Sequence, residues 1–141
     1  MSDRRLEELT ECRRCDLSLT RTRVVVGSGP ASAPLLVVGE APGRTEDEGG
    51  QPFVGRSGQL LRRLILEEWG LGENEYLITN VVKCRPPENR TPRATEIAAC
   101  QPWLDLERAA WNPPRVLAVG NVAARAVLGL REGVSVVHGR V

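Results

Sequence analysis

Several residue types are scarce in this chain of 141 residues. Lys83 is the only lysine, Phe53 the only phenylalanine and His138 the only histidine. No apolar run approaches the roughly 20 residues that span a bilayer, and the charged opening from Met1 to Arg5 is not followed by the apolar segment of a signal peptide. The formal net charge is only +1, which by itself favours no particular partner. We therefore expect a cytoplasmic protein without membrane contact.

The apolar runs of the chain have the length of strands. The length of the whole chain suits one domain with its own core, so we treat 1–141 as a single domain. The apolar run at 35–38, bounded by Pro34 and Gly39, predicts a buried parallel strand. Further buried strands are predicted at 76–82 and, after Pro113 and Pro114, at 116–119. A fourth strand is expected at 134–137.

Helix signals fall between these runs. We expect a short helix at 4–11, a helix capped by Ser57 with Leu60, Leu61, Leu64, Ile65 and Trp69 on one face, and one begun by Thr91 and Pro92. Another helix opens at Gly120 and closes at Gly129. The alternation predicts an α/β domain, a three-layer sandwich with a central, mainly parallel sheet.

Ligands of such sheets bind at the carboxyl ends of the strands. This rule selects Gly39 to Gly43, Asn80 and the pair Gly120–Asn121. Two glycines and a proline within 39–43 permit a tight turn that presents N–H groups to a planar ligand. Phe53 follows in a Gly/Pro loop, where its ring is suited to stacking on a base. The Asn80 amide offers a donor and an acceptor that match the edge of uracil, although an Asn in this position is often bonded to a nearby loop.

Four cysteines are spaced as C-x2-C (Cys12, Cys15) followed much later by Cys84 and Cys100. A pair in a polar turn without an export signal indicates a metal centre rather than disulfides, although Cys100 alone would also suit a core. Four thiolates fit zinc or an iron-sulfur cluster. The wide spacing of the second pair favours a 4Fe-4S cluster, with zinc as the alternative.

Two long segments carry a resemblance to a known family. GEAPGRTEDEGGQPFVGRSGQLL (39–61) and ITNVVKCRPPENRTPRATEIAAC (78–100), with the leading C-x2-C, resemble the iron-sulfur uracil-DNA glycosylases of family 4. The resemblance implies a monomeric DNA-repair enzyme that flips deoxyuridine out of uracil-containing DNA and hydrolyses its N-glycosidic bond, leaving an abasic site. It also implies that Cys12, Cys15, Cys84 and Cys100 hold a structural 4Fe-4S cluster.

The resemblance also implies roles for single residues. Uracil and water would be bound by Gly39, Ala41, Pro42 and Gly43. Phe53 would stack on the base and Asn80 would read its edge. Glu40 is the first candidate for a catalytic carboxylate acting on the water or the sugar cation, and Glu46 and Asp47 are second candidates, although acidic loop residues are often merely solvated.

One family motif is not found in this sequence. Family members carry a His-Pro motif beyond the matching segments, whereas His138 is followed by Gly139. Because a missing donor costs about 100- to 1000-fold in rate, we expect a truncated glycosylase or one with weakened activity. The alternative is a uracil-DNA-binding protein that does not cleave. A covalent-trapping sister group is disfavoured because position 41 is Ala, and a zinc deaminase because its signature is absent.

A basic segment lies beside two of the cysteines. Lys83, Arg85, Arg90 and Arg93 could grip DNA phosphates, or they could form a solvated charged loop. The residues alone favour neither interpretation.

Overall fold

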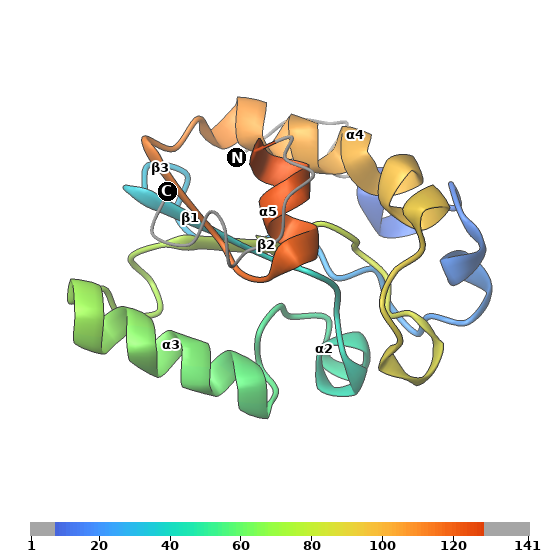
Figure 1. The fold of residues 1–141 in the computed structure, drawn as a ribbon, viewed down its shortest axis with the longest axis horizontal. Coiled ribbons are helices and arrows are strands. Elements are labelled where there is room, and N and C mark those ends of the chain that lie inside the picture. Colours follow the sequence, from blue (N-terminus) through green and yellow to red (C-terminus); the bar gives the residue numbers. More distant parts are fainter. Residues whose placement is uncertain (1–7, 129–141) are drawn as a thin grey trace.

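The computed structural model describes residues 8–128, and Figure 1 shows their arrangement. Of the helix expected at 4–11, a 3-10 turn η1 at Glu8–Glu11 lies inside this range, followed by η2 at Asp16–Leu19. The strand expected at 134–137, Gly129 and His138 lie outside the described residues.

Within residues 8–128, three parallel strands form the sheet, at the three places predicted there. They are β1 (Leu35–Gly39), β2 (Leu77–Asn80) and β3 (Arg115–Ala118), in the order β2-β1-β3. All residues of β1 and β2 are buried because both strands are covered on both faces. The register pairs Gly39 with Asn80 at the carboxyl ends. Two of the residues predicted to bind ligand are therefore neighbours across the sheet.

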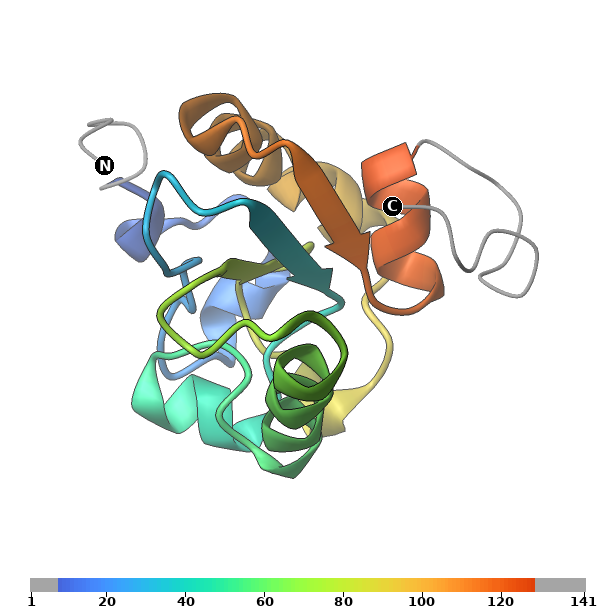
Figure 2. The same cartoon turned by 90° about the vertical axis from the view of Figure 1, so that its left-hand side faces the viewer.

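Helices cover both faces of the sheet, which confirms the α/β sandwich. Leu36 and Val38 of β1 pack with Leu104 of α4 (Ala94–Trp111) and Ala123 of α5 (Asn121–Leu128). The alternate residues of β1 face the other way, toward α3 (Arg56–Trp69). Figures 1 and 2 show α4 and α5 on one side of the sheet and α3 on the other.

The helix starts differ from the sequence-based expectation. Helix α3 has Gly55 at its N-cap rather than Ser57, and α4 has Arg93 there rather than Thr91. In α4 the Glu96 carboxylate accepts a hydrogen bond from the N–H of Arg93 at 2.8 Å. A glutamate at the third helical position thus satisfies a donor that the predicted Thr91 cap was expected to serve.

The loop expected after β1 contains a helix. This helix, α2, spans Arg44–Gly49, and its N-cap is Gly43. The carboxylate of Glu46 accepts a hydrogen bond from the N–H of Gly43 at 2.9 Å. The short acidic stretch lacks apolar periodicity, so the usual sequence signal for a helix is absent.

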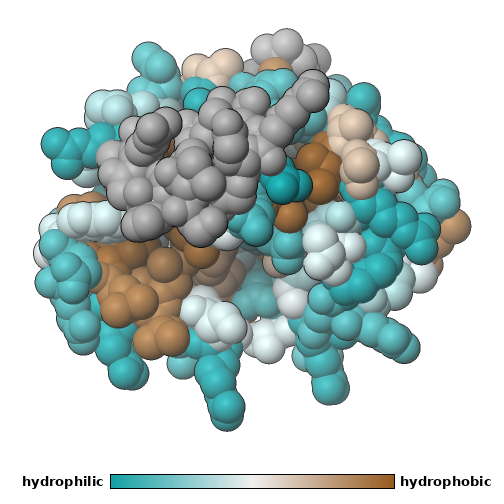
Figure 3. Space-filling view, viewed as in Figure 1, coloured by the Kyte–Doolittle hydropathy of each residue, from teal (hydrophilic) through white to brown (hydrophobic). Residues whose placement is uncertain are grey.

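The apolar face predicted for α3 is only partly buried. Ile65 is buried and Leu61 packs against the same cluster, but the side chains of Leu60, Leu64 and Trp69 are about half exposed. Figure 3 shows a mostly hydrophilic face on which apolar side chains gather near α3. Within residues 8–128, no helix combines the length and apolarity required to cross a bilayer.

Leu104 offers a direct test of the packing of α4 on the sheet. Its side chain is fully buried, so Leu104→Ala should lower the free energy of unfolding by about 2–5 kcal/mol through lost contacts and a cavity. The half-exposed Leu60 is the matched control, and Leu60→Ala should cost about 0.5 kcal/mol or less. Denaturant unfolding followed by circular dichroism measures both, and equal losses would contradict the described core.

Candidate functional site

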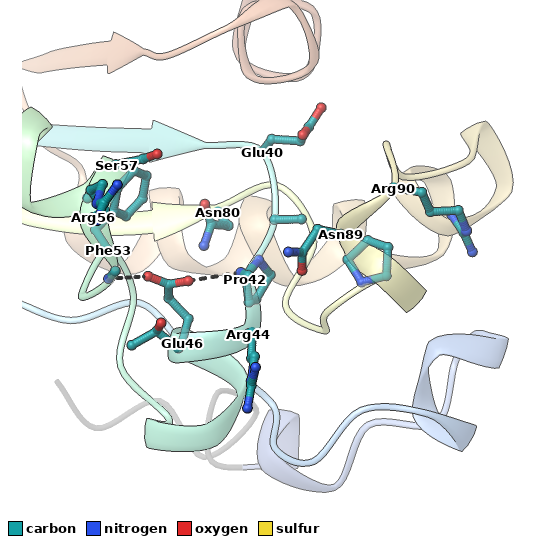
Figure 4. A pocket seen from close by; sticks show the side chains of 16 residues that line it. Glu40, Pro42, Arg44, Glu46, Phe53, Arg56, Ser57, Asn80, Asn89 and Arg90 are labelled. Atoms are coloured by element: carbon teal, nitrogen blue, oxygen red, sulfur yellow. Dashed lines mark hydrogen bonds between the residues drawn. The ribbon is translucent and has the colours of Figure 1, made fainter.

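A pocket opens at the carboxyl ends of β1 and β2. Its volume is about 470 Å³, within the range of small-molecule sites. The walls come from the β1–α2 loop, the start of α3, the end of β2 and the loop before α4, and Figure 4 shows their side chains. Of the predicted site residues, it is lined by Glu40, Ala41, Pro42, Gly43, Glu46, Phe53 and Asn80. The predicted Gly120–Asn121 pair does not line it.

The tight turn after β1 is locked to β2 by backbone hydrogen bonds. The N–H of Val81 donates to the carbonyl of Gly39 at 2.9 Å, and the N–H of Val82 donates to that of Glu40 at 3.1 Å. At Gly39 there is no room for a side chain, since a Cβ would lie 2.2 Å from Cζ of Phe53 and 2.7 Å from Oδ1 of Asn80. The absence of that Cβ lets the ring and the amide approach the backbone together.

Phe53 lines the pocket with a ring that also rests on the core. One side packs against the cluster formed by β1, β2 and α3, which the polar neighbours of Phe53 in the sequence did not predict. Its backbone adopts φ 56°, which is unfavourable for an aromatic residue. The Arg62 guanidinium holds this backbone by donating to the carbonyls of Pro52 and Phe53, both at 3.0 Å, and to the Tyr76 hydroxyl at 3.0 Å.

Asn80 closes the inner end of the pocket. The residue is 3% exposed, and its carboxamide makes no hydrogen bond to any of the described residues. Figure 4 places this amide between the Phe53 ring and the loop of Pro42. An amide that makes no hydrogen bond within the protein and faces a pocket can bind a complementary polar edge.

The three predicted carboxylates occupy different environments. Glu46 accepts hydrogen bonds from the backbone N–H groups of Val54 and Gly55 at 2.9 and 2.7 Å in addition to the one at its own N-cap. Asp47 is buried away from the pocket and accepts from the N–H groups of Thr22 and Arg23. Glu40 is exposed at the pocket, and in Figure 4 its side chain points away from Glu46.

Arginines surround the pocket mouth. Arg44, Arg56 and Arg90 contribute to its lining. Arg90 pairs with the Glu96 carboxylate at 2.7 and 2.8 Å, and these hydrogen bonds hold the pKa of Glu96 below its usual range. Lys83 fits neither interpretation of the basic segment, phosphate contact or solvated loop, because its side chain is completely buried.

The four cysteines meet around a second, smaller cavity. Cys12 and Cys15 come from the turn between η1 and η2, Cys84 follows β2 and Cys100 lies in α4; all four line this cavity. Within residues 8–128, no three Cys, His, Asp or Glu side chains are arranged to hold a single metal ion. The structure thus brings the predicted ligands from distant parts of the chain together around one cavity.

Polar groups surround the cysteine sulfurs. Trp103 donates its indole N–H to Sγ of Cys12 at 3.2 Å, and Arg21 donates to Sγ of Cys84 at 3.4 Å. Burial raises the pKa of the Cys84 thiol to about 11 and that of Cys100 to about 12. Because metals bind thiolates, the donors and nearby cations partly offset the cost of ionising these buried thiols.

Arg62 is a site residue that the sequence analysis missed. It lies seven residues inside α3 within an arginine pair, Arg62 and Arg63, and nothing in the pattern distinguishes the two. The structure separates them, since Arg62 holds the Phe53 loop and Arg63 is exposed.

Replacement of Arg62 tests whether its side chain holds the Phe53 loop in place. Arg62→Met leaves two carbonyls and the Tyr76 hydroxyl without their donor, so we expect a loss of about 1–3 kcal/mol in the free energy of unfolding. Amide exchange at Val54 and Gly55 should also accelerate. Arg63→Met is the matched control and should change neither quantity; comparable effects of the two variants would refute the assignment.

Comparison with known proteins agrees with this geometry. The family model described as the uracil DNA glycosylase superfamily matches residues 26–140. The "Type-4 uracil-DNA glycosylase" of Thermotoga maritima is 47% identical over 117 residues, which cover 83% of this chain and 60% of the relative. That of Sulfurisphaera tokodaii is 44% identical over 121 residues, 86% of this chain and 55% of the relative.

A different type within the same group is more distant. The "Type-5 uracil-DNA glycosylase" of Pyrobaculum aerophilum is 36% identical over 116 residues, 71% of this chain and 50% of the relative. The chain spans about half to three fifths of the length of these three relatives. The type-4 matches confirm the resemblance drawn from 39–61 and 78–100, and the family model over most of the chain shows that this protein belongs to the uracil DNA glycosylase superfamily.

Proposed function

We propose that this chain recognises deoxyuridine flipped out of DNA and hydrolyses its N-glycosidic bond, releasing uracil and leaving an abasic site. The observation that carries the proposal is the unbonded Asn80 amide beside the Phe53 ring in the pocket at the end of the sheet. The names of the type-4 relatives support it. We further propose a cytoplasmic protein that acts as a monomer on uracil-containing DNA.

Base recognition follows from the shape and polarity of the pocket. The Phe53 ring provides an apolar surface on which a flat base can stack. The Asn80 amide can donate to O4 of uracil and accept from its N3–H. Adenine and guanine do not present that pattern on a ring of the same size, so the pocket selects a pyrimidine by shape and uracil over cytosine by hydrogen bonding.

The chemistry requires charge stabilisation and a placed water. Breaking the glycosidic bond leaves positive charge on the sugar and negative charge on uracil, which fixed dipoles and charges can stabilise. Glu40 is the one predicted carboxylate that lines the pocket without a hydrogen bond to the described residues, so we assign it to the water or the sugar cation. Glu46 and Asp47 are engaged by backbone N–H groups and hold the surrounding loops in place.

Excision assays test the proposed function directly. On a uracil-containing oligonucleotide, Asn80→Ala should reduce the rate of abasic-site formation about 100-fold or more. Phe53→Ala removes the ring on which the base stacks, an interaction worth about 1–3 kcal/mol, so the excision rate should fall roughly 5- to 150-fold. Glu40→Gln should cost about 100- to 10,000-fold in turnover. Glu68→Gln, an exposed site on α3, is the matched control and should retain full activity.

Binding and excision must be measured on the same samples. If the protein binds the uracil oligonucleotide but forms no abasic product, it is a non-cleaving uracil-DNA-binding protein rather than an enzyme. Excision that survives Asn80→Ala and Phe53→Ala unchanged would overturn the assignment of this pocket.

We also propose that the four cysteines hold a 4Fe-4S cluster. The four cysteines line one cavity, and the wide spacing of the second pair in the sequence favours a cluster over a single zinc ion. A cubane offers four iron corners, one for each of these cysteines. Bound there, the cluster would act as a structural crosslink between the N-terminal turn, the end of β2 and α4.

Metal analysis distinguishes a cluster from zinc. Protein purified without oxygen should be brown and contain about four irons and four sulfides per chain. Cys100→Ser should reduce both contents and lower the unfolding temperature, whereas Trp69→Phe, far from the cavity, should change neither. A colourless protein with one zinc per chain would contradict the assignment.

A further inference from the structure

A buried ion pair lies directly behind the base-binding pocket. The side chains of Lys83 and Glu107 are 0% and 2% exposed, and the Lys83 ammonium donates to a Glu107 carboxylate oxygen. The same ammonium donates to the Thr79 hydroxyl and to the backbone carbonyl of Asn80, both at 2.6 Å. All three ammonium protons are therefore used inside the protein.

The carboxylate half of the pair is equally well satisfied. Glu107, on α4, accepts from the Thr79 hydroxyl at 2.9 Å and from the N–H of Gly27 at 3.0 Å. Gly27 has no room for a Cβ, which would lie 2.6 Å from that carboxylate. The pair thus joins α4, β2 and the segment before β1 in one closed polar network.

Stability alone is a weak reason for such a network. Two charges lose their hydration on burial, and an apolar pair of similar size is often as stable or more so. Neither charge lines the base-binding pocket or reaches solvent. The role of the pair is indicated instead by the other atoms to which the two charged groups are hydrogen-bonded, above all the Asn80 carbonyl.

Within the described residues, the Asn80 carbonyl accepts no hydrogen bond from a neighbouring strand. In a strand, alternate residues direct their backbone groups to the same edge. On the outer edge of β2, Ile78 exchanges two hydrogen bonds with Ser28 at 2.9 Å each. Two residues further along, the Asn80 carbonyl on that edge is taken by the Lys83 ammonium instead.

Lys83 also contacts the cysteine cavity. Lys83 lines that cavity and directly precedes Cys84 in the sequence, and its backbone N–H forms a hydrogen bond to Cys100. The backbone of Lys83 thus belongs to the cysteine loop, while its side chain reaches the last residue of β2.

We propose, on the basis of the proposed function, that Lys83 is a positioning residue: with Glu107 as counter-ion, it fixes the peptide of Asn80 and thereby the direction of the Asn80 amide in the pocket. The orientation of the peptide plane after Asn80 is coupled to the direction of the Asn80 Cα–Cβ bond. The same plane orients the Val81 N–H, which donates to the carbonyl of Gly39. Loss of the ammonium frees this plane, and a displacement of about 1 Å at a reacting group can cost about 100-fold.

The test removes both charges together, so that neither remains buried alone. Lys83→Met with Glu107→Gln retains the side-chain lengths and an acceptor for the Gly27 N–H. In folded, iron-loaded protein, inhibition by free uracil should weaken at least tenfold and excision should fall about 100-fold. Affinity for an oligonucleotide without uracil should not change, because phosphate contacts are untouched.

A double-mutant cycle separates positioning from general stability. If Lys83 acts through the amide, the paired replacement should have no further effect on uracil inhibition in an Asn80→Ala background. Leu104→Ala, which destabilises the same helix, is the control and should leave uracil inhibition unchanged. Additive effects in the cycle, or unaltered uracil inhibition in the paired variant, would overturn the inference.

Two further outcomes keep the test decisive. Should the paired variant not fold, Thr79→Val removes one acceptor of the ammonium while both charges stay paired, and it should weaken uracil inhibition three- to tenfold; no change would refute the inference. Wild-type protein that neither binds nor excises uracil would overturn the proposed function and this inference with it. Active wild type with an unaffected variant overturns the inference alone.

Discussion

The parallel pairing of Gly39 with Asn80 is the contact on which the pocket depends. It places the turn after β1 beside the amide that ends β2, and the missing Cβ at Gly39 admits the Phe53 ring to the same spot. A shift of one residue in register would turn Asn80 to the other face of the sheet. The site is therefore a property of strand pairing first and of side-chain chemistry second.

Much of the fold could be predicted from the sequence, because its signals are local. Largely apolar runs located all three strands to within a few residues, and the carboxyl-end rule located the pocket. The N-caps Gly55 and Arg93 could not be predicted, because carboxylates elsewhere satisfy their backbone donors. Glu96, three residues on, accepts from the N–H of Arg93, and Glu46, nine residues earlier in α2, accepts from that of Gly55. The role of Arg62 depends on a contact with a loop nine residues earlier, for which the pattern holds no signal.

Lys83 shows the opposite limit of sequence reasoning. In a basic segment beside two cysteines, a lysine resembles a phosphate ligand, yet Glu107 lies 24 residues away and draws it into the core. Charge alone does not indicate whether a side chain faces DNA or a buried counter-ion. Asn80, the last residue of β2, lines the base-binding pocket, and Lys83 and Cys84 line the cysteine cavity. The two cavities are therefore connected through the short stretch of backbone that follows β2.

The left-handed backbone of Phe53 affects the thermodynamics of binding. Because Arg62 and the sheet fix this loop in the folded protein, its conformational entropy is lost during folding rather than when a ligand arrives. A flat ligand then meets an aromatic surface that is already in place, and little of its interaction energy is consumed in ordering the protein. Selection among ligands consequently falls on the shape of the ligand rather than on the ability of the loop to adapt.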